Sequence, residues 1–243
     1  MRRFVKMGGM TYASLFLRFL AVAVFAVLPS AQAQPAVAGP PAARTIILVR
    51  HGAYQADSAN PSPGPGLLPV GVAQAKLAAS RLAAMGRFDA IFSSPMTRAQ
   101  ETARVIAADV AHGSFEILPQ LAECTPVTWR KEIIKDETAE SMAACKATLD
   151  ALFLQRFVPA VGSPRREIFV AHGNVIRSLV VRALGVDPEA WLEMSIAHAS
   201  ITEILVEPDG RFKVISVGDV GHLPLNLQSG VTGVGDKSLT VPR

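Results

Sequence analysis

Thr45-Ile46-Ile47-Leu48-Val49-Arg50-His51-Gly52 is the stretch of sequence that decides the fold. Its first part is continuously apolar and rich in β-branched residues, which favours a strand that is buried on both faces. Glu167-Ile168-Phe169-Val170-Ala171 has the same character and is followed by His172-Gly173. Strands buried on both faces are typical of parallel sheets that carry helices on each side. The two stretches therefore predict the centre of an α/β sheet.

The rest of the chain alternates between helical and strand-like patterns. Apolar residues recur at helical spacing from Val72 to Gly86, and Phe88 to Ser93 then has the pattern of another buried strand. A hairpin is expected around Pro208-Asp209-Gly210. These patterns predict a three-layer α/β/α sandwich with a mostly parallel central sheet and antiparallel edge strands. The other expected elements are helices at 96–110, 138–157 and 175–184 and strands at 115–118, 200–206 and 212–217.

Residues 1–33 have the pattern of a secretory signal peptide. Arg2, Arg3 and Lys6 precede an apolar run, and Ala31-Gln32-Ala33 supplies the small residues of a cleavage point after Ala33. A transmembrane anchor is the competing interpretation, but Arg18 leaves an apolar run shorter than the roughly 20 residues that a span requires. We therefore expect an exported protein, periplasmic or secreted, with no stable membrane span in its mature form.

The charge balance changes once this segment is set aside. Four of the 24 Lys and Arg residues lie in residues 1–33, which leaves 20 basic residues against 20 acidic ones. A neutral mature chain gives no reason to expect nucleic acid as a partner. We expect a flexible leader rich in Pro, Ala and Gly at 34–43, one domain at 44–225 and a C-terminal tail at 226–243.

Cys124 and Cys145 are the only cysteines of the chain. Export would place them in a compartment where a disulfide persists, but their spacing alone does not decide between a bridge and two separate thiols. They form no CxxC pair and no histidine pattern lies near them, so they make a poor metal site. We expect neither a metal ion nor a cofactor.

Two predicted strands end in a histidine followed by a glycine, at His51 and at His172. Open α/β sheets bind their ligands beyond the carboxyl ends of the strands, so the two imidazoles are expected to meet there. A single histidine at a strand end is more often a hydrogen-bonding residue of the scaffold. The pair, with Arg50 beside the first histidine, indicates a site of chemistry.

Three segments resemble a known family in the same order along the chain. Leu48 to Gly52 resembles the signature of the histidine phosphatase superfamily, also called phosphoglycerate-mutase-like. Ser93-Ser94-Pro95-Met96-Thr97-Arg98-Ala99-Gln100-Glu101-Thr102 is similar to its second phosphate-binding segment, and Val170 to Arg177 is similar to its second-histidine segment. The resemblance spans residues 44–223. It implies hydrolysis of a phosphomonoester without a metal ion, through a phosphohistidine intermediate.

The resemblance also implies a role for each matching residue. His51 matches the nucleophile, Arg50 and Arg98 match the arginines that clamp the phosphate, and His172 matches the second histidine that contacts it. Glu123 resembles the general acid and base of the mutase-like branch, although an exposed loop carboxylate is the alternative interpretation. These residue types suit the chemistry because guanidinium groups neutralise phosphate and a neutral imidazole attacks phosphorus without a metal ion.

The remaining polar residues are weaker candidates. We expect His112, His198 and His222 to be structural, although His198 or Asn174 could border the pocket. The segment Ala53-Tyr54-Gln55-Ala56-Asp57 departs from the usual family pattern of Ser and Asn. This departure bears on the outer pocket and leaves the nucleophile and the clamping arginines intact.

The branch of the family is indicated by Glu167 to Leu184, by Pro188-Glu189-Ala190-Trp191-Leu192 and by Ser200-Ile201-Thr202-Glu203. These segments are similar to the branch of mitochondrial phosphoglycerate-mutase-like Ser/Thr protein phosphatases and their bacterial relatives. That similarity implies a phosphatase acting on a phosphorylated small molecule or a phosphoprotein. A phosphoryl-transferring mutase and a catalytically silent phosphate-binding module are the alternatives. The substrate and the oligomeric state remain open.

Overall fold

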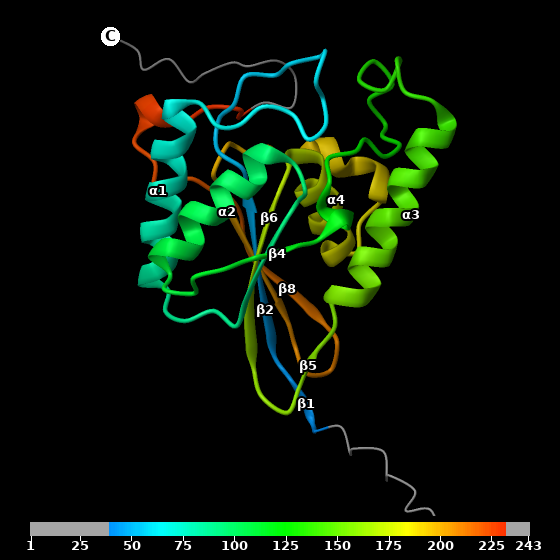
Figure 1. Cartoon of the computed structure of the whole chain (residues 1–243). Coiled ribbons are helices and arrows are strands. Elements are labelled where there is room, and N and C mark those ends of the chain that lie inside the picture. Colours follow the sequence, from blue (N-terminus) through cyan, green and yellow to red (C-terminus); the bar gives the residue numbers. More distant parts are fainter. Residues whose placement is uncertain (1–38, 232–243) are drawn as a thin grey trace, which may run out of the picture. The chain divides into compact units, whose positions relative to one another are not determined.

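The computed structural model describes residues 39–231 and contains a six-stranded sheet in the order β4-β3-β6-β2-β7-β8 (Figure 1). The four strands β4, β3, β6 and β2 pair in parallel, whereas β7 pairs antiparallel with both β2 and β8. The predicted mostly parallel sheet with antiparallel edge strands is confirmed. The strands are β2 (Arg44–Arg50), β3 (Ala90–Ser93), β4 (Glu116–Ile117), β6 (Arg165–Ala171), β7 (Ile201–Val206) and β8 (Phe212–Asp219).

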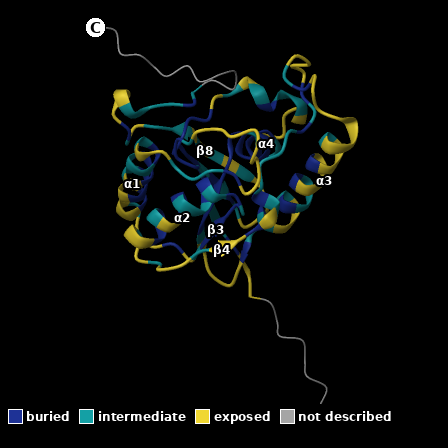
Figure 2. Cartoon of the chain, turned by 45° about the horizontal axis from the view of Figure 1, so that its top comes forward, coloured by how far each residue is buried: buried dark blue, intermediate teal, exposed yellow. Residues whose placement is uncertain are grey.

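Helices cover both faces of the sheet because the middle of each central strand is apolar toward both faces. On β2, Ile47 and Val49 pack toward one helical layer, while Ile46 and Leu48 pack toward the other. The first layer consists of α1 (Pro69–Ala84) and α2 (Thr97–Asp109), and the second consists of α3 (Ala139–Arg156) and α4 (Gly173–Leu184). The strands β2, β3, β6 and β7 lie in the buried interior, whereas β4 and the outer faces of α1, α2 and α3 are exposed (Figure 2).

The ordered fold extends beyond the domain limits expected from sequence at both ends. Pro41–Ala42, within the segment that we expected to be a leader, forms β1 and pairs antiparallel with β5 (Ala160–Val161). At the other end, Ser229 and Gly230 hydrogen-bond with residues of the domain. Local composition did not indicate these contacts because their partners are distant in sequence.

The signal peptide expected at 1–33 lies outside the described residues. Within residues 39–231, no helix combines the length and apolar character that crossing a membrane requires.

The helices α3 and α2 begin in different ways. Thr138 caps α3 by accepting a hydrogen bond from the backbone N–H of Ser141, as its position before a helical pattern favours. For α2, Met96 occupies the cap position and no side chain caps the helix. The Ser94 hydroxyl instead accepts a hydrogen bond from the Met96 N–H. Ser94 thereby remains in the turn between β3 and α2, where it faces the candidate site.

Three short 3-10 helices complete the described fold: η1 (Pro119–Leu121), η2 (Pro188–Glu193) and η3 (Leu225–Leu227). Cys124, just after η1, forms a disulfide with Cys145 of α3. The spacing of the two cysteines in the sequence did not decide whether they form a bridge. It fastens the irregular segment between η1 and α3 to the second helical layer, one residue from Glu123.

Candidate active site

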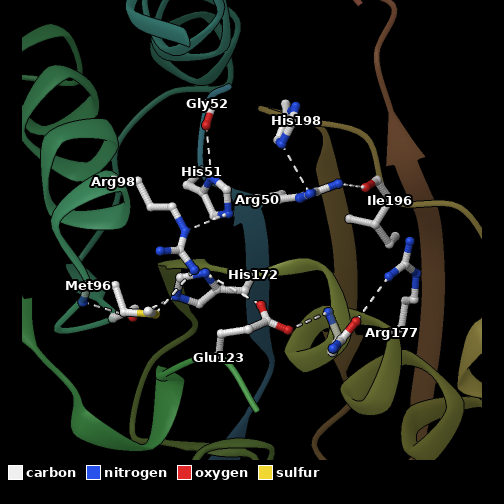
Figure 3. A network of polar contacts seen from close by, with 12 residues as sticks. Arg50, His51, Gly52, Met96, Arg98, Glu123, His172, Arg177, Ile196 and His198 are labelled. Atoms are coloured by element: carbon white, nitrogen blue, oxygen red, sulfur yellow. Dashed lines mark hydrogen bonds and ion pairs between the residues drawn. The ribbon is translucent and has the colours of Figure 1, made fainter. Parts of the chain in front are cut away.

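The parallel pairing of β2 and β6 brings the two strand-end histidines together. Arg50 and Ala171 are partners in the register of this pair, so His51 and His172 emerge side by side at the same edge of the sheet. The backbone N–H of His51 donates to the Ala171 carbonyl at 3.0 Å, and the two imidazole centroids are 5.0 Å apart. The site expected at the carboxyl ends of the strands therefore has both histidines in it (Figure 3).

Two hydrogen bonds define the state of the His51 ring. Nδ1 lies 2.8 Å from the Gly52 carbonyl oxygen, which can only accept, so Nδ1 carries the ring proton. Nε2 then presents a lone pair, and Nε of Arg98 donates to it at 3.2 Å. Burial, followed by the positive charges around the ring, holds the pKa of His51 well below its usual value. His51 is therefore a neutral, oriented imidazole with Nε2 directed into the site.

Arg98 reaches the site from the second residue of α2. Its guanidinium lies 4.3 Å above the Tyr54 ring and donates to the Met96 sulfur at 3.3 Å. Tyr54 also meets the His51 ring edge to face, with centroids 5.1 Å apart. The departure from the family pattern after the first motif thus supplies an aromatic ring that supports both the arginine and the histidine.

Arg50, the last residue of β2, is held by hydrogen bonds to residues in the C-terminal part of the described chain. Nη1 donates to the carbonyls of Ile196 and Gly230 at 2.6 and 2.8 Å, and Nη2 donates to Nε2 of His198 at 3.1 Å. Gly230 lies in the segment predicted to be a tail. The described end of the chain therefore takes part in positioning one of the two predicted clamping arginines.

His198, which we expected to be structural and which could border the pocket, belongs to the same group of side chains. Its ring centroid lies 5.5 Å from that of His51, and its Nδ1 lies 2.9 Å from the Ser229 hydroxyl. An arginine only donates, so Nε2 of His198 accepts and the proton sits on Nδ1. Burial, with Arg50 and Arg98 nearby, lowers the pKa of His198 to about 3. His198 follows no strand or motif, so only the tertiary structure reveals it.

His172 and Glu123 form the other wall of the site. Nε2 of His172 lies 2.7 Å from the Ser94 hydroxyl, and Nδ1 lies 3.5 Å from a carboxylate oxygen of Glu123. Burial first, and then Arg98 and Arg50, keep the pKa of His172 well below its usual value. The ring is consequently neutral, and its contact with Glu123 is a polar approach rather than an ion pair. The Glu123 side chain remains partly open to solvent, at 26% exposure.

The start of α4 contributes backbone donors and a further arginine. The Asn174 N–H donates to a Glu123 oxygen at 3.3 Å, which directs this carboxylate toward the helix N-terminus. Arg177 is buried and donates to the Met194 carbonyl and to the Asn174 side chain. A side chain at Gly173 would have its Cβ 3.1 Å from Arg177, so glycine keeps the approach to the helix start open. We assigned Arg177 no role from the sequence.

These side chains surround an inner cavity of about 260 Å³. Three arginines face it, against a single carboxylate, so it suits a compact dianion such as a phosphate group. Among residues 39–231, no group of three or more His, Cys, Asp and Glu side chains has an arrangement that could hold a metal ion. The cavity is lined by Arg50, His51, Tyr54, Arg98, Glu123, Gly173, Asn174 and Arg177.

The structure brings together all five residues that the sequence singled out. Arg50, His51, Arg98, Glu123 and His172 lie within one network of polar contacts (Figure 3). Outside the network, His112 approaches the Ser114 carbonyl, and His222 donates to the Ala199 carbonyl. These two histidines occupy the structural positions expected of them.

Comparison with known proteins gives consistent results. The family model of the histidine phosphatase superfamily (branch 1) matches residues 46–219. The mitochondrial Ser/Thr-protein phosphatase Pgam5 of Drosophila persimilis is 35% identical over 200 residues, covering 77% of this chain and 67% of the relative. The protein of the same name from Xenopus laevis is 34% identical over 193 residues, covering 76% of this chain and 68% of the relative.

A solved structure agrees with the fold. A phosphoserine phosphatase from Entamoeba histolytica, determined in complex with 3-phosphoglyceric acid, has a TM-score of 0.55 and 22% identity. The similarity covers 74% of this chain and 100% of that one. At this level of identity, the similarity concerns the arrangement of helices and strands.

Proposed function

This chain belongs to branch 1 of the histidine phosphatase superfamily, a metal-independent family of phosphatases, and we propose that it hydrolyses phosphomonoesters through a phosphohistidine formed on Nε2 of His51. The observation that carries the proposal is the hydrogen bonding of the His51 ring. The Gly52 carbonyl binds Nδ1–H, while Nε2 faces a cavity lined by arginines. A neutral imidazole held in this way is a competent nucleophile toward phosphorus.

Binding of the substrate follows from the charges around the inner cavity. Arg50 and Arg98 neutralise the phosphoryl oxygens, and His172 contributes a further polar contact. The N–H groups at the start of α4 add partial positive charge on the same side. Because Arg98 and His172 are buried and Arg50 is held by three hydrogen bonds, little reorganisation is needed when the charge redistributes in the transition state.

In the proposed reaction, Glu123 gives up one proton in the first step and takes up another in the second. Nε2 of His51 bonds to phosphorus as the ester P–O bond breaks, and the departing alkoxide takes a proton from the Glu123 carboxylic acid. The Glu123 carboxylate then accepts a proton from water as the water oxygen bonds to phosphorus. The P–Nε2 bond breaks, which releases inorganic phosphate and restores both residues.

The relatives support a phosphoprotein as substrate, because they are named as Ser/Thr-protein phosphatases. A phosphorylated small molecule is the other class that fits the inner cavity. The silent binding module has less support, since a module that only binds phosphate does not need an oriented imidazole beside a carboxyl group.

The decisive experiment compares the wild type with His51→Ala in metal-free phosphate release from p-nitrophenyl phosphate. We expect turnover to be lost in the variant, and we expect radiolabelled wild-type protein to carry an acid-labile, base-stable phosphoryl group. His112→Ala is the matched control and should retain full turnover. A folded wild-type protein without turnover would contradict the proposal and favour the binding module.

We further propose that the protein is exported and that its leader is removed after Ala33. The Cys124–Cys145 disulfide supports this, because such bonds persist mainly in oxidising compartments. Mass spectrometry of the exported fraction should find Gln34 as the first residue. A membrane-bound protein with an intact N-terminus would instead support the anchor.

A further inference from the structure

A larger hollow adjoins the inner cavity on its open side. It has a volume of about 470 Å³ and shares three lining residues with the inner cavity: Tyr54, Arg98 and Glu123. Most of its wall comes from the segment between β2 and α1, with Met96 and Ala122 opposite. We call it the outer hollow. Its shared wall means that a substrate whose phosphate lies beside His51 can continue into it.

In-line displacement determines which part of the substrate enters the outer hollow. The leaving oxygen must lie opposite Nε2 of His51 and within reach of the acid that protonates it. In the proposed mechanism this acid is Glu123, which borders both spaces. The alcohol part of the substrate, rather than the phosphate, is therefore directed toward the outer hollow.

The lining of the outer hollow is chiefly apolar and has little positive charge to offer. Apart from the shared residues, Asp57 is its only charged side chain, and two serines are its other polar residues. The guanidinium of Arg98 contacts His51, Tyr54 and Met96 in the free protein, and in the proposed complex it is occupied by the phosphoryl group of the substrate. An anionic leaving group would thus meet the negative charge of Asp57 without gaining a positively charged partner. The apolar lining consists of Tyr54, Ala56, Pro61, Pro65, Met96 and Ala122.

The wall of the outer hollow is fastened at several points. Tyr54 and Leu67 form a β-bridge, and the Leu68 N–H donates to the Ala53 carbonyl. Glu101 of α2 accepts a hydrogen bond from the Leu67 N–H, and the Thr97 N–H donates to the Pro63 carbonyl. These contacts hold both ends of the segment and Pro63 in place before the substrate arrives, which reduces the cost of ordering the wall on binding.

We propose that the outer hollow selects phosphomonoesters whose alcohol part is apolar and carries no negative charge. This inference rests on the proposed function and names the substrate class for the same site. An aromatic or aliphatic group next to the ester oxygen contacts Met96 and the proline-rich wall. A carboxylate or a second phosphate in that place is repelled by Asp57.

Non-hydrolysable phosphonates test this selectivity without the chemical step. The probes are 3-phenylpropylphosphonate and 3-phosphonopropionate, each used as a competitive inhibitor of p-nitrophenyl phosphate turnover, with inorganic phosphate as the reference. For the wild type, we expect the phenyl compound to bind about tenfold more tightly than the carboxylate.

Variants at Asp57 test the effect of its negative charge on ligand binding. The Asp57 carboxylate accepts a hydrogen bond from the Ala59 N–H, and an asparagine keeps this acceptor while it removes the charge. We expect Asp57→Asn to tighten binding of 3-phosphonopropionate about twofold and Asp57→Lys about fivefold, with inhibition by inorganic phosphate unchanged. The control is Asp109→Lys, the same charge change at an exposed position at the end of α2.

Equal inhibition of the wild type by the two phosphonates would overturn the inference and leave the proposed function intact. Equal effects of Asp57→Lys and Asp109→Lys would overturn it as well, since the charge would then act through the net charge of the protein. Absence of p-nitrophenyl phosphate turnover in folded wild type would instead remove the proposed function, and the inference with it.

Discussion

Nε of Arg98 donates a hydrogen bond to Nε2 of His51 at 3.2 Å, so the arginine contacts the nitrogen atom that we propose as the nucleophile. An incoming phosphoryl group must take over this hydrogen bond from His51. A phosphate oxygen is a stronger acceptor for a guanidinium than a neutral imidazole is, which makes the exchange favourable. The same contact thus orients His51 in the free protein and delivers Arg98 to the phosphate.

The first prediction concerns Glu123. Glu123→Gln cannot protonate a leaving oxygen, so we expect kcat for an alkyl phosphate to fall about 10²-fold or more. p-Nitrophenolate leaves without a proton, and a burst of it should remain while breakdown of the phosphoenzyme becomes slow. Rapid-mixing kinetics measure both quantities.

The control for this prediction is Glu132→Gln, an exposed carboxylate of the segment between η1 and α3. Its kinetics should match the wild type for both substrates. If Glu123→Gln slowed the alkyl and aryl esters equally and without a burst, a role in proton transfer would be wrong.

The second prediction concerns the disulfide next to Glu123. Removal of the Cys124–Cys145 bridge, which spans 21 residues, should lower the free energy of unfolding by about 3 kcal/mol through the entropy of the unfolded chain. The Cys124→Ala, Cys145→Ala double variant should also lose more activity toward alkyl phosphates than toward p-nitrophenyl phosphate, because the Glu123 segment is released from α3.

Denaturant unfolding, with and without a reductant, measures the loss of stability. The reductant should destabilise the wild type and have no effect on the double variant. Unchanged kinetics in a less stable double variant would show that other contacts are sufficient to hold Glu123.

The third prediction concerns Gly230. Its φ of 64° is in the left-handed region, and a Cβ there would lie 2.7 Å from the His198 ring and 2.9 Å from Nη1 of Arg50. Gly230→Ala should therefore displace Arg50, raise KM and the inhibition constant of inorganic phosphate about tenfold, and leave kcat less affected.

Gly210→Ala is the matched control because this glycine also has a positive φ, of 86°, but its Cβ would meet nothing within 4 Å. Both variants should be destabilised by about 1 kcal/mol through backbone strain. Only the variant at Gly230 should bind phosphate less well, and weaker phosphate binding in both would contradict a positioning role.

The fourth prediction is a dependence of stability on pH. His51, His172 and His198 are buried and neutral, with pKa values lowered from the usual 6.5, whereas in the unfolded chain they bind protons below that pH. The unfolded state then holds more protons, so stability rises with pH in this range and is lost as the pH falls below about 6.5. The slope should reach about 1.4 kcal/mol per pH unit for each histidine.

Urea unfolding between pH 7 and pH 5 measures this slope. His198→Gln removes one of the three histidines and should reduce the slope by about 1.4 kcal/mol per pH unit, the contribution of one histidine. A slope near zero in the wild type would mean that the three rings take up protons in the folded state.

The sequence alone determined the fold class and the centre of the site. Arg50, His51, Arg98 and His172 lie where a strand passes into a loop or helix, and the local pattern of apolar residues fixes that geometry. Parallel pairing of the strands then brings these strand ends together without further information. The motifs that contain these residues could be recognised because each of them lies in one short stretch of sequence.

Only the tertiary structure decided which residues hold these groups in place. His198 and Gly230 contact Arg50 across 148 and 180 positions of sequence, from segments with no periodic pattern. The ring proton of His51 is fixed by a backbone carbonyl, and the partner of Cys124 by the packing of α3. Such contacts depend on the relative placement of distant segments, which no local pattern records. Sequence therefore determined the candidate reacting groups, and the packing of the chain determined their orientation and protonation.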